Sequence, residues 1–136
     1  HVQRLLDAQR AVLVQPYLDQ VDSAGETALM FFDGRFSHAI RKGPLLRLDE
    51  GPTEKLFAPE EITARTPSVD EIGLATRVVA AIPGGAPLYA RVDLLRAGDG
   101  SPCVLELELT EPSLFFPFGE GSAERYVQAA RRRLPG

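Results

Sequence analysis

Leucines alternate with glutamates in residues 103–110, CVLELELT, and this pattern limits the folds open to the chain. Successive side chains of a β-strand point to opposite faces, so the pattern predicts a strand with one face on a core and the other on solvent or a ligand. The expected core face consists of Cys103, Leu105, Leu107 and Leu109. The expected opposite face consists of Val104, Glu106, Glu108 and Thr110. Such a strand requires a sheet, and the sheet requires a second layer over its apolar face.

Two β-hairpins are predicted. Residues 88–95, LYARVDLL, precede the glutamate strand and are joined to it by the turn-rich sequence RAGDGSP. If that turn centres near Gly100, Asp93 lies about opposite Glu106 and Arg91 about opposite Glu108. The other hairpin covers residues 27–42, where an Asp-Gly pair at 33–34 separates TALMFF from RFSHAIRK. An Asp-Gly pair between strand-like runs is among the strongest short-range hairpin indications.

Helical periodicity is clearest in two segments. Ser68 and Glu71 form a capping box that opens the first helix, and Pro-Gly-Gly at 83–85 ends it. Its expected apolar stripe consists of Val69, Ile72, Ala75, Val78, Val79 and Ile82. Ser122 is expected to cap the second helix. The apolar side of that helix consists of Ala123, Tyr126, Val127, Ala130 and Leu134.

The remaining segments are less regular. Residues 2–9 predict the tail of a helix, and residues 11–18 predict a short strand ended by Pro16. Residues 43–67 hold four prolines and show no period, so we expect a loop that borders a binding site. The order of elements predicts a single α+β domain over residues 1–136, with an antiparallel sheet built from two hairpins and helices packed on one face.

Composition and charge argue against several classes of function. The net charge of −4 disfavours nucleic-acid binding, because a basic surface is missing apart from a short run at Arg131, Arg132 and Arg133. No apolar run approaches the roughly 20 residues that cross a membrane, and no signal-peptide pattern opens the chain. We therefore expect a cytoplasmic protein that does not bind membranes. The single cysteine, Cys103, is expected to be a passive strand residue.

The carboxylates on one sheet face need an explanation, since like charges directly across a sheet destabilise it. One explanation is a divalent cation, because Mg²⁺ binds through one or two carboxylates and takes its other ligands from water and phosphates. The alternative is a non-catalytic α+β interaction module whose solvent-exposed acidic face carries weak surface pairs. Leu-Glu alternation does not separate the two, because any amphipathic strand shows it.

LYARVDLL, the turn, VLELELTEPSLFF and a helix beginning GSAERY together resemble the C-terminal half of ATP-grasp ligases. This superfamily includes prokaryotic glutathione synthetase and the cycloserine-forming cyclo-ligase. Its members hold the Mg²⁺ ions of ATP with an Asp on one strand and a Glu-x-Asn pair on the next. The resemblance places Asp93 at the first position, Glu106 at the Glu and Glu108 at the Asn. Glu108 departs from the family pattern, although its carboxylate is still a hard oxygen ligand.

The N-terminal part of the chain extends the resemblance. VQPYL, a polar spacer and ALMFFDGRFSHAIRKGP are similar to the family's adenine hinge followed by its first hairpin. The resemblance implies that the backbone around Gln15, Tyr17 and Leu18 binds the adenine edge and that Glu26 accepts the ribose hydroxyls.

Basic residues of the two hairpins have implied roles as well. Lys42, or its neighbour Arg41, falls where the family places a cation near the transferred phosphate or the acyl substrate. Arg91 is either a clamp on a phosphate or substrate, or a partner for Glu108. His38 has no evident partner in the sequence and is expected to be structural.

The resemblance implies an ATP-dependent carboxylate–amine or carboxylate–thiol ligase that acts through an acyl phosphate. Its ligands would be ATP, a small carboxylate, a nucleophile and up to two Mg²⁺ ions, for which Mn²⁺ can substitute. It allows a homodimer. The family's N-terminal domain and small lobe have no counterpart in residues 1–136, so we expect this chain to be the C-terminal ATP- and Mg-binding lobe of a longer ligase and to turn over no ATP alone.

Overall fold

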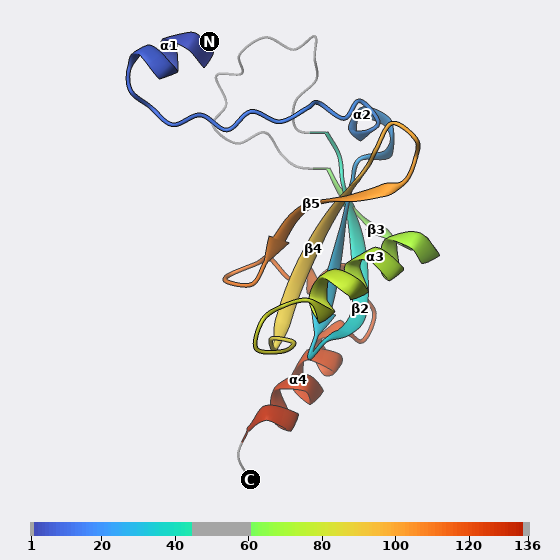
Figure 1. The fold of residues 1–136 in the computed structure, drawn as a ribbon. Coiled ribbons are helices and arrows are strands. Elements are labelled where there is room, and N and C mark those ends of the chain that lie inside the picture. Colours follow the sequence, from blue (N-terminus) through green and yellow to red (C-terminus); the bar gives the residue numbers. More distant parts are fainter. Residues whose placement is uncertain (1, 45–60, 135–136) are drawn as a thin grey trace.

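The computed structural model describes residues 2–44 and 61–134, and these form a five-stranded antiparallel sheet with helices around it (Figure 1). The strand order is β3-β2-β1-β4-β5. The strands are β1 (Glu26–Phe32), β2 (Arg35–Lys42), β3 (Ile62–Arg65), β4 (Tyr89–Arg96) and β5 (Pro102–Glu108). The helices are α1 (Val2–Asp7), α2 (Val21–Ala24), α3 (Val69–Ala80), the 3-10 turn η1 (Phe116–Phe118) and α4 (Ser122–Arg133). The α+β class and the antiparallel sheet are as the sequence predicts.

The first hairpin, β1 with β2, is confirmed at the predicted turn. Asp33 and Gly34 have φ of 53° and 76°, the left-handed conformation that a tight two-residue hairpin turn requires at both positions. The pairing contains one irregularity: Met30 faces His38 while Phe31 faces Phe36, so one extra residue is accommodated in β2.

The second hairpin, β4 with β5, has the predicted register but not the predicted alternation. Asp93 pairs with Glu106 and Arg91 with Glu108, as expected. Leu94, however, pairs with Val104 and not with Leu105, because a β-bulge interrupts the ladder there. Asp93 and Leu94 point to opposite faces, so their partners Glu106 and Val104 do as well. The prediction that Val104 shares a face with Glu106 is therefore wrong, and Leu105, at 40% exposure, is not core.

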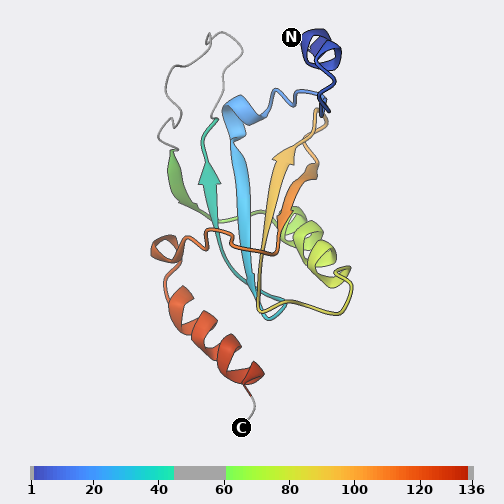
Figure 2. The same cartoon turned by 90° about the vertical axis from the view of Figure 1, so that its left-hand side faces the viewer.

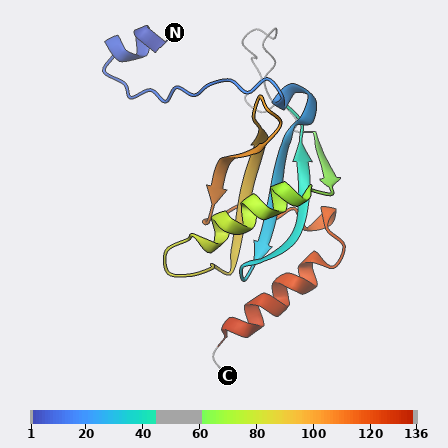
Figure 3. The ribbon, with the colours of Figure 1, turned by 45° about the vertical axis from the view of Figure 1, so that its right-hand side comes forward.

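Helix α3 crosses one face of the sheet and buries the larger apolar cluster (Figure 3). The buried members of this cluster are Leu29, Phe31, Ala39, Ala75, Val79, Ala90, Val92 and Leu94. The predicted capping box is present, with the Glu71 carboxylate accepting the backbone N–H of Ser68 at 2.7 Å. Val69 was expected in the apolar stripe but is 89% exposed, because the helix turns that position away from the sheet.

The other face carries a smaller apolar patch at its centre, made by Ala28, Met30 and Ile40. Leu114, Phe115 and Phe118 pack over it from the segment that follows β5, and Figure 2 shows this segment running across the sheet. Helix α4 then lies at the end of the sheet where β1 turns into β2 (Figures 1 and 2).

Side-chain burial in α4 departs from the expected apolar side. Ser122 and Ala129 are its buried residues, and the Tyr126 ring packs against Phe32. Val127 and Leu134, which the sequence pattern placed on the apolar side, are 47% and 68% exposed. The helix packs near one end of a sheet and not across it, so the sheet covers only a narrow strip of its surface.

Two further segments differ from the prediction. Residues 11–18 form an irregular segment and not the predicted strand, and Leu13 is 84% exposed, because none of the described strands pairs with this segment. Ile62–Arg65, inside the predicted loop 43–67, pairs with β2 as the edge strand β3. Residues 45–60 of that loop lie outside the described residues. No helix in the described ranges is long and apolar enough to cross a membrane.

Candidate metal and nucleotide site

Six charged residues meet on the face of the sheet that carries the smaller apolar patch. Glu26 begins β1 and Lys42 ends the neighbouring β2, while Arg91 and Asp93 lie on β4. Glu106 and Glu108 follow on β5, directly across from Asp93 and Arg91. Thus the antiparallel register of four strands places these side chains together. We call Asp93, Glu106 and Glu108 the carboxylate cluster.

Asp93 is the centre of the cluster and is only 1% exposed. Lys42 donates to it from Nζ at 2.9 Å, and Arg91 donates from Nε at 2.8 Å and from Nη2 at 2.8 Å. Burial by itself raises the pKa of a carboxyl, but these two cations outweigh it and hold the pKa of Asp93 below its usual value. Asp93 is therefore an ionised buried carboxylate.

Arg91 bridges the two strands at the cluster. Its guanidinium pairs with Asp93 on its own strand and also with Glu108 on β5. The Phe115 ring lies over this guanidinium, with the Arg91 Cζ 5.9 Å from the ring centroid. Burial would lower the pKa of Arg91, yet the contact with Asp93 raises it. The expected pairing with Glu108 is present in the structure, and Arg91 is buried, with 6% of the residue exposed.

The carboxylate cluster has the geometry of a cation site. Carboxylate oxygens of Asp93, Glu106 and Glu108 all lie within 4.8 Å of one another. Asp93 is buried, Glu108 half-buried and Glu106 exposed, so the cluster opens to the surface on one side. With Glu26 included, four carboxylates stand against two cations, Lys42 and Arg91. Two negative charges remain, the amount that one divalent cation neutralises.

Lys42 and Glu26 form an ion pair at the edge of the cluster. Burial raises the pKa of Glu26, and the nearby Asp93 adds to this while Lys42 opposes it. Burial alone would lower the pKa of Lys42, but its contacts with Glu26 and Asp93 raise it. Gly25, with φ of 70°, lets the backbone before β1 lie close to the backbone of Lys42. A Cβ at this position would lie 2.5 Å from the carbonyl oxygen of Lys42.

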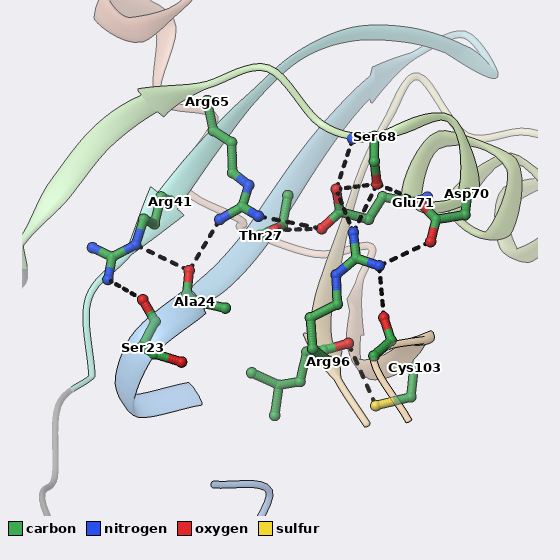
Figure 4. A network of polar contacts seen from close by, with 12 residues as sticks. Ser23, Ala24, Thr27, Arg41, Arg65, Ser68, Asp70, Glu71, Arg96 and Cys103 are labelled. Carbon is green, nitrogen blue, oxygen red and sulfur yellow. Dashed lines mark hydrogen bonds and ion pairs between the residues drawn. The ribbon is translucent and has the colours of Figure 1, made fainter. Parts of the chain in front are cut away.

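Arg41, the other basic candidate, points to the opposite face. Its Nε donates to the carbonyl of Ala24 at 3.0 Å. This face carries a separate polar network, shown in Figure 4, in which the buried Glu71 accepts a hydrogen bond from Thr27 at 2.9 Å and pairs with Arg96 at 3.1 Å. The network joins the start of α3 to β1 and β4 and does not reach the carboxylate cluster.

The expected adenine-hinge residues border a hollow of about 220 Å³. Gln15, Pro16 and Leu18 line it from the irregular segment, and Leu95, Cys103, Val104 and Leu105 line it from β4 and β5. Among the described residues, the backbone of residues 11–17 makes no hydrogen bond to other backbone groups. We call this the hinge hollow. Tyr17 does not line it, since its hydroxyl donates to Asp22 at 2.7 Å.

His38 has a structural place, as expected, but it has partners that the sequence did not reveal. Its Nε2 lies 2.9 Å from the carbonyl of Leu114, and its Nδ1 lies 2.9 Å from the hydroxyl of Ser37. Burial lowers the pKa of His38. The ring therefore anchors to β2 the segment that carries Phe115.

Sequence reasoning missed two features of the site. Phe115 was part of an unassigned stretch, and its φ of 47° is not predictable from residue type because a bulky residue rarely adopts it. The bulge at Leu105 was also missed, since Leu-Glu alternation continues through it without a break in the sequence. The Lys42–Glu26 pair depends on the irregularity in β2, because the turn at Asp33–Gly34 alone would place Glu26 opposite Arg41.

Comparison with known proteins gives close matches that are all longer than this chain. Cycloserine biosynthesis protein DcsG of Streptomyces lavendulae is 45% identical over 139 residues, which cover 98% of this chain and 46% of the relative. The crystal structure of D-cycloserine synthetase DcsG matches with a TM-score of 0.76 and 43% identity, over 89% of this chain and 42% of that one. This chain thus spans less than half the length of these relatives.

More distant structures share the fold. The D-alanine–D-alanine ligase from Bacillus anthracis complexed with ATP matches with a TM-score of 0.56 and 17% identity, over 96% of this chain and 43% of that one. The ATP-grasp ligase PsnB matches with a TM-score of 0.50 and 23% identity, over 80% of this chain and 34% of that one. No protein-family model matches the chain. The chain is therefore a homologue of part of DcsG, and it shares its fold with the ATP-grasp ligase PsnB and the D-alanine–D-alanine ligase.

Proposed function

We propose that this chain is the C-terminal ATP- and Mg²⁺-binding part of an ATP-dependent ligase that joins a small carboxylate to an amine or thiol through an acyl phosphate. The homology to D-cycloserine synthetase supports ligase chemistry of this kind. The protein then needs little covalent chemistry of its own, and its side chains act by positioning ATP and substrate and by balancing charge.

Asp93, Glu106 and Glu108 are the proposed metal ligands. Their donor set fits Mg²⁺, because all three offer hard carboxylate oxygens that already lie within 4.8 Å of one another. When bound, the metal ion would neutralise charge on the phosphates of ATP. Glu108 in place of Asn suits the same ion, and Arg91 offsets its extra negative charge in the free protein.

Lys42 and Arg91 are the proposed cations of the reaction. Lys42 lies between Glu26 and Asp93 and would meet the transferred phosphoryl group beside the metal ligands. Arg91 would act chiefly by holding Asp93 and Glu108 at the spacing that the metal requires. Glu26, at the start of β1 and paired with Lys42, would accept hydrogen bonds from the ribose hydroxyls.

The hinge hollow is the proposed adenine site. Leu95, Val104 and Leu105 give it an apolar wall, and the backbone of the irregular segment opposite, around Gln15, Tyr17 and Leu18, would supply hydrogen bonds to the adenine edge. In this arrangement the bulge in β5 has a role, because it turns Leu105 away from the core and toward the nucleotide.

The observation that carries the proposal is the burial of Asp93 in a cluster that retains two negative charges. A solvated acidic face, as in the alternative interaction module, would leave its carboxylates in water and would not bury one against two cations. Taking an ionised carboxylate out of water costs several kcal/mol before its partners are counted, a cost that the carboxylates of an exposed acidic face do not incur.

Calorimetry with Mn²⁺ and with Mg-ATP on the full-length protein tests the proposal. Glu106→Gln should weaken binding of Mn²⁺ alone by about tenfold or more, since one of three carboxylate ligands is lost. Glu111→Gln is the matched control, because Glu111 is an exposed glutamate just past the same strand and outside the cluster. Equal Mn²⁺ affinity in the wild type and Glu106→Gln would contradict the metal assignment.

A thiol probe tests the nucleotide assignment separately. Cys103 lines the hinge hollow and is partly exposed, so alkylation of its thiol reports on occupancy of the hollow. ATP should slow the alkylation of Cys103, while inorganic phosphate should not. Alkylation at the same rate with and without saturating ATP would place the adenine elsewhere.

A further inference from the structure

A second charged hollow lies at the opposite end of the sheet, where the turn between β1 and β2 meets α4. Its volume is about 220 Å³, and the Phe32 and Phe36 rings contribute to its wall. Arg35 from the start of β2 and two arginines of α4, Arg125 and Arg132, line it as well. None of the described residues that line it carries a carboxylate. We call it the arginine hollow.

Arg125 is held in place without being neutralised. Its Nε donates to the Ser37 hydroxyl at 3.0 Å and its Nη2 to the Ser37 carbonyl at 3.2 Å. Its Nη1 donates to the carbonyl of Glu120 at 2.8 Å. These acceptors are uncharged, so they fix the orientation of the guanidinium but leave its full positive charge. A charge fixed in this way can bind an anion with little further loss of side-chain entropy.

The other two arginines add to this charge. Arg132 shares the single carboxylate of Asp33 with Arg133, so one negative charge serves two guanidiniums. The two contacts lower the pKa of Asp33, which therefore stays ionised. Arg35 makes no ion pair with any residue in the described ranges. The hollow thus carries excess positive charge in a chain whose net charge is −4.

The arginine hollow is remote from the carboxylate cluster. Strand β1 begins at Glu26, beside the cluster, and ends at Phe32, in the wall of the hollow. Six steps along a strand correspond to roughly 20 Å. The phosphates of a nucleotide bound at the cluster would therefore not reach the arginines.

We propose that the arginine hollow binds a phosphate group, either as inorganic phosphate or as a phosphate monoester. Guanidinium groups recognise oxyanions through paired N–H donors, and three of them line one small space. One guanidinium already gives a planar carboxylate two parallel hydrogen bonds, whereas a tetrahedral phosphate dianion accepts hydrogen bonds from several directions at once. The volume lies below the roughly 300 Å³ typical of sites for larger ligands, which favours a phosphate group over a whole nucleotide.

Calorimetric titration of the full-length protein with inorganic phosphate, in the presence of saturating Mg-ATP, tests this inference. Binding should persist with ATP present, and Arg35→Gln should weaken it by about tenfold, the effect of losing one charge-assisted contact. Because Arg35 holds no other described residue, Arg35→Gln should unfold at the same temperature as the wild type and turn over ATP at the same rate. Arg131→Gln is the matched control, since Arg131 lies on α4 and does not line the hollow.

Three results would overturn the proposal. Phosphate binding that disappears when ATP is added would place the anion in the nucleotide site. Equal loss of affinity in Arg35→Gln and Arg131→Gln would indicate diffuse attraction to a basic helix. Acetate binding as tightly as phosphate would indicate a carboxylate site, as expected if an acidic protein segment docks there. Failure of phosphate binding would leave the proposed ligase function untouched, because that function is tested separately with Mn²⁺ and Glu106→Gln.

Discussion

Replacement of Glu71 by Gln should destabilise the chain by about 3 kcal/mol, because a buried carboxylate loses its charge while its partners remain. Glu71 is 2% exposed and accepts hydrogen bonds from the Ser68 N–H at 2.7 Å and the Thr27 hydroxyl at 2.9 Å. It also pairs with Arg96 at 3.1 Å and with Arg65 at 3.7 Å (Figure 4). In Glu71→Gln one carboxylate oxygen is replaced by an NH₂ group, which is a donor and would face the N–H and O–H groups that donate to Glu71.

The size of this stability loss depends on whether Arg96 and Arg65 keep another partner once the Glu71 carboxylate is gone. Removing one member of a buried ion pair costs about 3 to 5 kcal/mol when the other member is stranded. Arg96 keeps a second partner in Asp70 at 2.8 Å, and neither Arg96 nor Arg65 is fully buried, so the lower end of that range applies. Glu124→Gln is the matched control, because Glu124 occupies the same third helical position in α4 and is exposed.

Urea unfolding followed by circular dichroism measures the difference in free energy of unfolding between Glu71→Gln and the wild type. The slope of that free energy against urea concentration should stay unchanged. Burial opposes ionisation of Glu71, but the hydrogen bonds from Ser68 and Thr27 outweigh it and lower the pKa of that carboxyl. Its contribution is thus present above the unfolded pKa, about 4.3, and is lost as pH falls through the lower folded value. The loss in Glu71→Gln should therefore be largest at neutral pH and shrink in acid. A loss below about 1 kcal/mol, or one equal to that of Glu124→Gln, would refute the reasoning.

Three further predictions concern the other face of the sheet. Gly119→Ala should lower the free energy of unfolding by about 1 to 3 kcal/mol, because its Cβ would lie 2.4 Å from Cγ of His38. Thermal unfolding measures this loss, and in a His38→Ala background, where the clashing ring is gone, Gly119→Ala should cost much less. Phe115→Leu should speed exchange of the Arg91 Nε–H with water, as followed by NMR, whereas Phe118→Leu in the same apolar patch should leave it unchanged; equal effects would assign the shielding to the segment and not to the ring over Arg91. Asp93→Asn should destabilise by about 3 kcal/mol in urea unfolding, since it removes one partner from both Lys42 and Arg91, and Glu106→Gln, at an exposed position, should change stability little.

The sequence by itself determined the local features of this protein. The Asp33–Gly34 turn, the capping box at Ser68 and Glu71, and the two hairpins follow from turn chemistry and short-range periodicity, which act within a few residues. The pairing of Arg91 with Glu108 and of Asp93 with Glu106 was predicted from a turn centred near Gly100, but the structure reaches it through the bulge, because Leu95 with Cys103 and the other pairs nearest the turn are one residue out of that register.

Only the tertiary structure decided which faces are buried and which charges meet. Val69 fits the helical stripe yet faces solvent, and residues 11–18 resemble a strand yet pair with none of the strands described in the structure. The Leu-Glu alternation that limits the fold also concealed the bulge at Leu105, since a bulge depends on the partner strand and leaves no mark on its own sequence. The contact of Lys42 with Asp93 and the Phe115 ring over Arg91 join residues far apart in the chain, and only packing brings them together.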